Sequence, residues 1–375
     1  MMLNLSRRRL PQTLTVSSVR TVICGSSIND RKLHQLAKSG RGGRSSYSGI
    51  LATVFGGTGF TGRYVINRLG RVGTQIMVPY RCDEHDIRHI RLMGDLGQIM
   101  FRPFSLRDTD AVSELVKHSN VVINLIGQDW ETRNYTYEDA NVEGARAIAR
   151  ACRDHGVERL IHVSALNVDK NSKSHWLRSK AAGEEAVLEE FPDATIVRPS
   201  DIYGQEDRFF NYYAELRMLP FGVPLLDGGL KATKIPLYVA DFAKAIAKMT
   251  VDDTTAGRIY ELYGPHEYLL YDLVGTIFRY SARRFQTITL PQWMFNAFLS
   301  VMETVGYIPW LTRDKLIRQN LSDRVTPELP GLEDLGIEKT TIDKIATFVL
   351  RRHVGVSGAD IDWDLVRKLN TQSRT

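Results

Sequence analysis

"VFGGTGFTG", Val54 to Gly62, runs an apolar segment directly into three glycines at three-residue spacing. In such a turn Gly56 lets the chain reverse sharply, Gly59 lets the backbone approach a pyrophosphate, and Gly62 lets the next helix pack close to the strand. The helix amino terminus attracts the phosphate charge. A structural turn is the alternative, but the strand before and the helix after favour a dinucleotide site. The loop residues predicted to bind cofactor are Gly56, Thr58, Gly59, Phe60, Thr61 and Gly62.

Strand-like apolar runs alternate with helical patterns along the rest of the first half of the chain. This alternation predicts an α/β protein with a Rossmann-type, doubly wound parallel sheet covered by helices on both faces. The strands are expected at Ile50–Phe55, Gln75–Tyr80, Gln98–Phe104, Val121–Ile126, Arg159–Ser164 and Ala194–Pro199. Helices are expected at Asp108–His118, Glu138–His155, Lys180–Phe191 and Tyr238–Met249.

From about Tyr203 the alternation loosens into loops rich in Pro and Gly, followed by a helix, the short strand "RIYELYG" and more helices. We therefore expect residues 49–203 to form the NAD(P)-binding Rossmann core. Residues 204–375 are expected to form a smaller mixed C-terminal lobe and tail, packed on the carboxyl edge of the sheet.

Residues 1–48 hold nine basic side chains and one acidic one, whereas the remainder of the chain carries a net charge of −2. The segment is also rich in Ser, which is typical of a mitochondrial or plastid transit peptide; a disordered basic tail is the alternative. We expect cleavage near Arg44–Tyr47. The acidic remainder disfavours an RNA-associated relative, because phosphate contacts need clustered Lys and Arg.

Three cysteines are too few and too far apart for a disulfide framework, which fits a reducing compartment such as the mitochondrial matrix. Cys82, His85 and His89 have spacings that could present ligands on one helical face. They lack a fourth ligand nearby, so a solvated helix is the better interpretation and no metal site is predicted.

The strand after the glycine loop indicates which nicotinamide nucleotide is bound. An NAD site has an acidic residue about twenty residues on, but here Arg81 stands nineteen residues beyond Gly62. A guanidinium can grip a 2′-phosphate, so NADP(H) is favoured. Asp83, two residues farther, keeps NAD(H) open as an alternative.

From Ile50 to about Gly264 the chain resembles the extended and atypical short-chain dehydrogenase/reductase superfamily. The resemblance rests on "GGTGFTG", "VVINLIG", "NVEGARAIARACRDHGVERLIHVSA", "VRPSDIYG" and "PLYVADFAKAI". It implies a catalytic serine, a tyrosine, and a lysine four residues beyond the tyrosine. Ser164 and Lys180 occupy the first and third positions, and Trp176 occupies the second. The remaining cofactor-binding residues that we predict are Asn124, Leu125, Gly127, Ser164 and Lys180.

Trp176 removes the proton donor of that reaction, because an indole N–H does not ionise at any working pH. Loss of a general acid costs about 10²–10⁴ in rate. His175 cannot readily substitute, since neighbouring residues on a helix point about 100° apart. We therefore predict a protein that is not an enzyme, with Ser164, Trp176 and Lys180 as a vestigial site; an NADPH-dependent mitochondrial reductase or epimerase is the alternative.

The chain also resembles a family of accessory subunits of mitochondrial NADH:ubiquinone oxidoreductase, complex I of the respiratory electron-transport chain. Two matching segments, Gln128–Tyr135 and Pro327–Ile337, are not general features of the superfamily. The resemblance implies a tightly held NADPH, other complex I subunits as partners, and a place on the matrix side of the inner membrane. There the protein would support the quinone-site region. The matching segments are "VFGGTGFTGRYVINRLG", "VVINLIGQDWETRNY", "LIHVSALN", "RPSDIYGQEDRF", "PWLTRDK" and "LPGLEDLGI".

The same resemblance implies phospholipid contact through the C-terminal lobe. "LPQWMFNAFLSVMETVGYIPWL", Leu290–Leu311, is dense in amphipathic aromatics that suit a protein or membrane interface, although they could equally pack against the sheet. Arg279, Arg283 and Arg284 precede it and could meet lipid phosphates. The charge-free run Gln286–Met302 contains a proline and polar residues, so no transmembrane helix is predicted.

Overall fold

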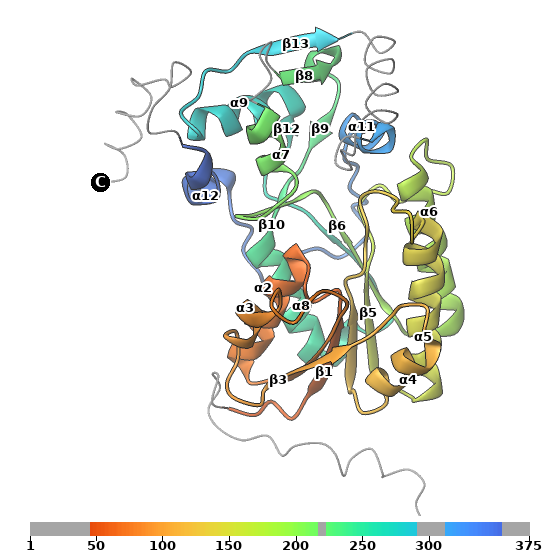
Figure 1. Cartoon of the computed structure of the whole chain (residues 1–375). Helices are drawn as coiled ribbons and strands as arrows, with labels where there is room; N and C mark the ends of the chain where they lie inside the picture. Colours follow the sequence, from red (N-terminus) through yellow and green to blue (C-terminus); the bar gives the residue numbers. More distant parts are fainter. Residues whose placement is uncertain (1–45, 217–222, 291–311, 355–375) are drawn as a thin grey trace, which may run out of the picture.

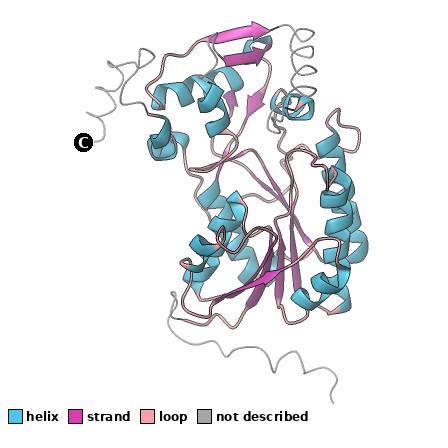
Figure 2. Cartoon of the chain, viewed as in Figure 1, coloured by secondary structure: helices cyan, strands magenta, loops and turns pink. Residues whose placement is uncertain are grey.

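The computed structural model describes residues 46–216, 223–290 and 312–354. Its centre is a seven-stranded sheet, in which every pair of neighbouring strands is parallel, with the order β11-β6-β5-β4-β1-β2-β3. The predicted Rossmann-type fold is confirmed (Figure 2). The strands are β1 (Leu51–Phe55), β2 (Gln75–Tyr80), β3 (Ile99–Pro103), β4 (Val121–Asn124), β5 (Arg159–Val163), β6 (Thr195–Pro199) and β11 (Ile259–Leu262).

Helices cover both faces of this sheet, as its buried apolar strands require (Figure 1). One face packs against a cluster that includes Val65, Ile66 and Phe242, and the other against a cluster that includes Ile148 and Val187. The first face carries α2 (Phe60–Val72), α3 (Arg88–Arg91) and α8 (Val239–Val251). The second carries α4 (Thr109–Val116), the π-helical turn η2 (Asp139–Glu143), α5 (Gly144–Asp154) and α6 (His175–Glu190).

Helix α6 begins five residues before the expected start at Lys180. Ser174 caps it, since its hydroxyl accepts a hydrogen bond from the Leu177 N–H at 3.3 Å. Asp314, far along the chain, accepts from the His175 N–H at 2.7 Å. The helix start therefore depends partly on a long-range contact, and it places Trp176 in the first turn.

A smaller lobe lies beyond the carboxyl edge of the sheet (Figure 1). It has its own apolar core, which includes Tyr203, Phe210, Leu273 and Val349. Its short strand pairs are β7–β10, β8–β13 and β9–β12. Its strands are β7 (Ile202–Tyr203), β8 (Val223–Leu226), β9 (Thr233–Lys234), β10 (Leu237–Tyr238), β12 (Tyr268–Leu269) and β13 (Thr287–Leu290). Its helices are α7 (Phe210–Glu215), η4 (Asp227–Gly229), α9 (Leu270–Tyr280), α11 (Arg313–Gln319), α12 (Ile342–Val349) and η6 (Arg351–His353).

The chain after Tyr203 contributes to both parts of the molecule. Helix α8 packs on α2, and β11 forms the edge of the central sheet, with the short η5 (Asp253–Thr255) between them. Later still, the Glu261 N–H donates to the Pro330 carbonyl at 3.0 Å, and Leu332 joins the core under α2. The division at Tyr203 remains a prediction about folding units, because the sheet itself draws on residues beyond it.

Two predictions fall largely outside the described residues. These are the presequence, residues 1–48, and the aromatic stretch Leu290–Leu311. None of the described helices combines the length and the apolar character that a membrane-spanning segment needs.

Candidate functional site

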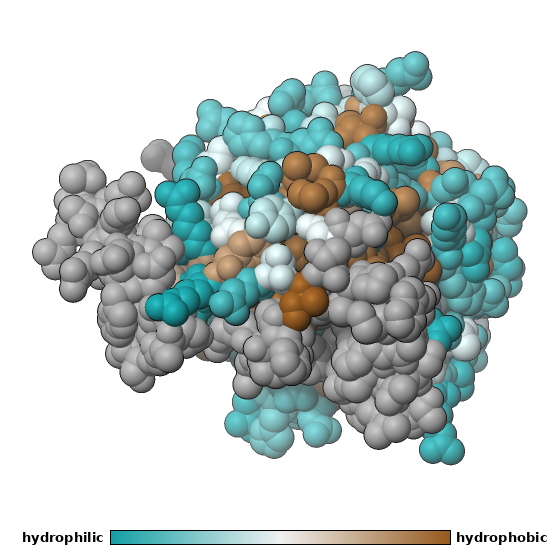
Figure 3. Space-filling view, turned by 90° about the horizontal axis from the view of Figure 1, so that it is seen from above, coloured by the Kyte–Doolittle hydropathy of each residue, from teal (hydrophilic) through white to brown (hydrophobic). Residues whose placement is uncertain are grey.

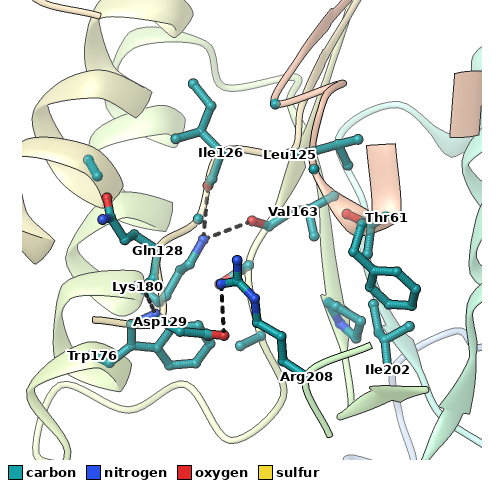
Figure 4. Close-up of a pocket in the computed structure, with 18 of the residues that line it drawn as sticks. Thr61, Leu125, Ile126, Gln128, Asp129, Val163, Trp176, Lys180, Ile202 and Arg208 are labelled. Carbon is teal, nitrogen blue, oxygen red and sulfur yellow. Dashed lines mark hydrogen bonds and ion pairs between the residues drawn. The ribbon is translucent and has the colours of Figure 1, made fainter. Parts of the chain in front are cut away.

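A cavity of about 680 Å³ opens at the carboxyl ends of the central strands (Figure 4). It lies where β1 is flanked by β2 on one side and by β4 on the other, so the chain leaves these strands in opposite directions. Open α/β sheets bind ligands at such a switch point. The cavity is lined by residues of the glycine loop, of the ends of β4 and β5, and of α11, among others.

The glycine loop forms one wall of this cavity. Gly56 has a φ of 76°, and a Cβ there would lie 2.9 Å from the Leu125 carbonyl atoms. A Cβ on Gly62 would lie 2.5 Å from the Gly56 oxygen and 2.6 Å from the Gly57 Cα. Both positions therefore require glycine, and the loop keeps the shape that cradles a pyrophosphate. The predicted residues that line the cavity here are Gly56, Thr58, Gly59, Phe60 and Thr61, with Gly62 packed behind them.

Asn124 shapes the loop after β4 rather than lining the cavity. Its side-chain oxygen accepts from the Ile126 N–H at 3.0 Å, and its amide nitrogen lies 3.1 Å from His162 Nδ1. Leu125 and Gly127, which follow, do line the cavity. Burial, aided by Lys180, lowers the pKa of His162 to about 3, so this imidazole is neutral at physiological pH.

Lys180 lies buried at the base of the cavity. Its Nζ donates to the carbonyl oxygens of Ile126 and Val163, each at 3.3 Å (Figure 4). Burial is the main reason that its pKa falls to about 8. Among the described atoms, the buried Ser164 Oγ has no hydrogen-bond partner, and Ser164 lines the cavity. An unpartnered hydroxyl and a buried ammonium beside a glycine cradle fit the ribose and amide of a nicotinamide nucleotide.

Trp176 lies in the same cavity, so the structure brings Ser164, Trp176 and Lys180 together as expected. Its indole N–H donates to the Gln128 carbonyl at 2.7 Å. The Arg318 guanidinium lies 4.2 Å from the centroid of the Trp176 ring, and Lys180 Nζ lies 5.9 Å from the same centroid. The indole N–H is therefore already hydrogen-bonded to the backbone, and two cations contact the π system of the ring.

A charged cluster around Asp129 was not predicted from the sequence. Asp129 lies 3.7 Å from Arg208 and 3.6 Å from Arg318, and Lys315 adds a third positive charge nearby. Burial opposes ionisation of Asp129, yet these three cations lower its pKa. Asp129 lies in the segment Gln128–Tyr135, which is not a general feature of the superfamily. That departure was the one sequence signal that could have pointed to this cluster.

Arg81 lies at the end of β2, where the adenosine ribose of a dinucleotide would lie. Its guanidinium is 5.2 Å from the Tyr135 ring centroid, and the guanidinium of Arg107 is 4.9 Å from the same centroid. Arg107 is a second cation that the sequence did not reveal. The exposed Asp83 is not among the residues that line the cavity.

Within the described ranges, no group of three or more His, Cys, Asp or Glu side chains is arranged to hold a metal ion. Cys82 lines the nucleotide cavity, whereas His85 and His89 are exposed around α3.

Comparison with known proteins identifies the wider family. Residues 52–263 match the model of the NAD dependent epimerase/dehydratase family. The chain is 48% identical over 349 residues to the mouse protein named NADH dehydrogenase [ubiquinone] 1 alpha subcomplex subunit 9, mitochondrial, covering 92% of each. It is 38% identical over 302 residues to the Neurospora crassa NADH-ubiquinone oxidoreductase 40 kDa subunit, mitochondrial, covering 80% of this chain and 79% of that one.

A solved structure shares the fold. The NAD complex of Thermus thermophilus UDP-glucose 4-epimerase superposes with a TM-score of 0.59 at 16% identity, covering 82% of this chain and all of the other. The chain therefore belongs to the NAD dependent epimerase/dehydratase family and, within it, to the group formed by these mitochondrial NADH dehydrogenase subunits.

Proposed function

We propose that the protein is an accessory, non-catalytic subunit of mitochondrial respiratory complex I that holds a structural NADPH. Its place is peripheral, on the matrix side of the inner membrane, where it supports assembly and stability near the quinone-site region. The observation that carries the proposal is the 48% identity to the mouse alpha subcomplex subunit 9 along 92% of both chains. Such coverage leaves no large part of the chain outside the match.

The site supports a retained nucleotide that does not turn over. Trp176 takes the position at which the superfamily has its tyrosine acid, and its N–H is bonded to the Gln128 carbonyl. A carbonyl substrate would thus find no ionisable hydroxyl at that position. Lys180 and Ser164 can still hold the nicotinamide half, because that contact needs only hydrogen bonds and charge.

Replacing Arg81 by alanine should shift nucleotide preference. Loss of a charge-assisted contact to the 2′-phosphate removes about 1.5–3 kcal/mol, so NADPH affinity should fall by about 10- to 100-fold. NADH lacks this phosphate, and its affinity should change by less than about twofold. Titration of the purified variant with each nucleotide checks this, with the exposed Arg102→Ala on β3 as the control. Equal losses for both nucleotides would place the 2′-phosphate elsewhere.

The smaller lobe offers surface for partner subunits and for the proposed phospholipid contact. Apolar side chains are distributed among polar ones over this part of the described surface (Figure 3). The exposed ones include Leu230, Leu269, Tyr271 and Phe348. Arg279 lies in the last turn of α9, and Arg283 and Arg284 follow that helix before β13. All three would be within reach of lipid phosphates at an inner-membrane surface.

Native electrophoresis of detergent-solubilised mitochondria tests the assembly proposal. We expect the chain to migrate with the large respiratory complex, and depletion of the chain to lower the amount of that complex. Migration as a small species, with the complex unaffected by depletion, would contradict the proposal. That result would favour the alternative, a free mitochondrial NADPH-dependent reductase or epimerase of the same superfamily.

A further inference from the structure

Asp129 is placed where the nucleotide-binding core meets chain from beyond Tyr203. Its carboxylate lies 3.7 Å from the Arg208 guanidinium (Figure 4). It also lies 3.6 Å from the Arg318 guanidinium. The Arg318 guanidinium also donates to the Asp129 carbonyl oxygen at 3.3 Å. A single core carboxylate is therefore contacted by cations from two separate later segments.

Helix α11, which supplies Arg318 and Lys315, is attached to the core at further points. Asp314 accepts from the Ser174 hydroxyl at 3.0 Å as well as from the His175 N–H, which joins α11 to the start of α6. Arg318 lies over the Trp176 ring. Every one of these contacts is polar or cation–π, and Leu316 is the one apolar side chain that this short helix buries.

The same helix forms a wall of the nucleotide cavity. Lys315, Arg318 and Gln319 line it, as do Gly59 and Thr61 of the glycine loop. A ligand that fills the cavity will touch both the core and α11. Binding to the closed arrangement alone stabilises that arrangement, because any ligand that binds one state preferentially shifts the equilibrium toward it.

We propose that α11 and Asp129 form a clasp over the nicotinamide half of the cavity: nucleotide leaves only when the Asp129 cluster separates, and bound nucleotide in turn holds α11 on the core. This inference rests on the proposed function, in which the cavity holds a nicotinamide nucleotide. Asp129 is a positioning residue, which acts through Arg318 and Arg208. Trp176, which takes the place of the superfamily's tyrosine acid, also contacts Arg318 and so forms part of the clasp.

The nucleotide dissociation rate tests the clasp. NADPH-loaded protein is mixed with an excess of an NADPH-oxidising enzyme, and the loss of bound NADPH fluorescence is followed. Asp129→Asn should release NADPH at least about tenfold faster than the unmodified chain, and Asp129→Glu should restore part of the slow rate. Asp110→Asn, an exposed carboxylate on α4, should release at the original rate. Equal rates for Asp129→Asn and Asp110→Asn would overturn the clasp.

Hydrogen exchange gives a second measurement that separates the two proposals. Amide hydrogens of residues 313–319 should exchange at least about tenfold more slowly with NADPH than without it, and Asp129→Asn should remove that difference. If the purified chain bound no nucleotide, the proposed function would fail. The clasp would then be judged by whether Asp129→Asn still speeds exchange in α11; unchanged exchange would overturn it.

The pH dependence of release follows from the lowered pKa of Asp129. A depressed carboxyl pKa means that the stabilising contacts are complete above the ordinary Asp pKa of about 4 and are lost as the pH falls through the lower, folded value. NADPH release should therefore not accelerate through loss of these contacts between about pH 7 and pH 5. If Asp129 did not hold the clasp closed, NADPH would leave Asp129→Asn as slowly as it leaves the original chain over this pH range.

Discussion

A chain carrying Gly62→Ala should purify without nucleotide. Gly62 lies in the first turn of α2, where helix propensity alone would favour alanine by about 1 kcal/mol. Packing opposes the change, because the new Cβ would lie 2.5–2.7 Å from backbone atoms of Gly56 and Gly57. Backbone cannot move aside as a flexible side chain can, so the glycine loop must shift. We expect nucleotide affinity to fall by more than about 100-fold, together with a loss of about 1–3 kcal/mol in the free energy of unfolding.

Gly275→Ala is the matched control. Gly275 also lies in a helix, α9, but a Cβ there would be 3.5 Å from the Phe285 ring, an ordinary contact. This variant should retain nucleotide and keep or gain stability. Equilibrium titration with NADPH and denaturant unfolding of both variants make the comparison. Normal NADPH binding by Gly62→Ala would show that the pyrophosphate is not bound at this loop.

Among single changes where the Rossmann core meets the smaller lobe, Lys234→Met should lower the free energy of unfolding the most. Lys234 is 3% exposed, and its Nζ lies 3.1 Å from Asp201 and 3.2 Å from Asp323. The methionine leaves Asp323 buried opposite an apolar side chain. Removing one partner of a buried ion pair costs about 3–5 kcal/mol, so we expect a loss of that size in the free energy of unfolding, measured by denaturant titration.

Its control is Lys170→Met, which removes an exposed pair with Glu185 and should cost less than about 1 kcal/mol. Burial opposes the charge on Lys234, but Asp201 and Asp323 raise its pKa above 10.5. A raised lysine pKa means that the contribution is complete below the unfolded value and is lost only as the pH rises through the folded value. The difference between original and variant should therefore stay constant from about pH 7 to pH 9. If Lys234→Met lost as little free energy of unfolding as Lys170→Met, the buried ion pairs of Lys234 would not stabilise the fold as we expect.

The central sheet and its nucleotide loop were predictable because their signals are local. The apolar run into "GGTGFTG" combines strand, turn and helix start within a few residues, and the structure has β1 and α2 at this place. The edge strand β11 was expected in the smaller lobe. Strand propensity does not say which sheet a strand joins, and the backbone pairing of Ile259–Leu262 with β6 is a long-range event.

The cofactor half of the site could be located from the sequence, but its closure could not. Ser164, Trp176 and Lys180 follow a known spacing, and the structure places all three at one cavity. Asp129 and Arg318 are 189 residues apart, and nothing local marks them as partners. Arg107 and Tyr135 likewise meet only because the loops after β3 and β4 open at the same edge of the sheet.

The nucleotide content of the assembled complex decides between a structural and a catalytic cofactor. The respiratory complex would be purified from mitochondria, exposed to a panel of carbonyl substrates, and then denatured so that released nucleotide can be separated and quantified by mass spectrometry. A structural role predicts about one NADPH for each copy of this chain, still reduced after exposure to every substrate. Oxidised nucleotide in proportion to a reduced carbonyl product, or a complex that contains none, would contradict it.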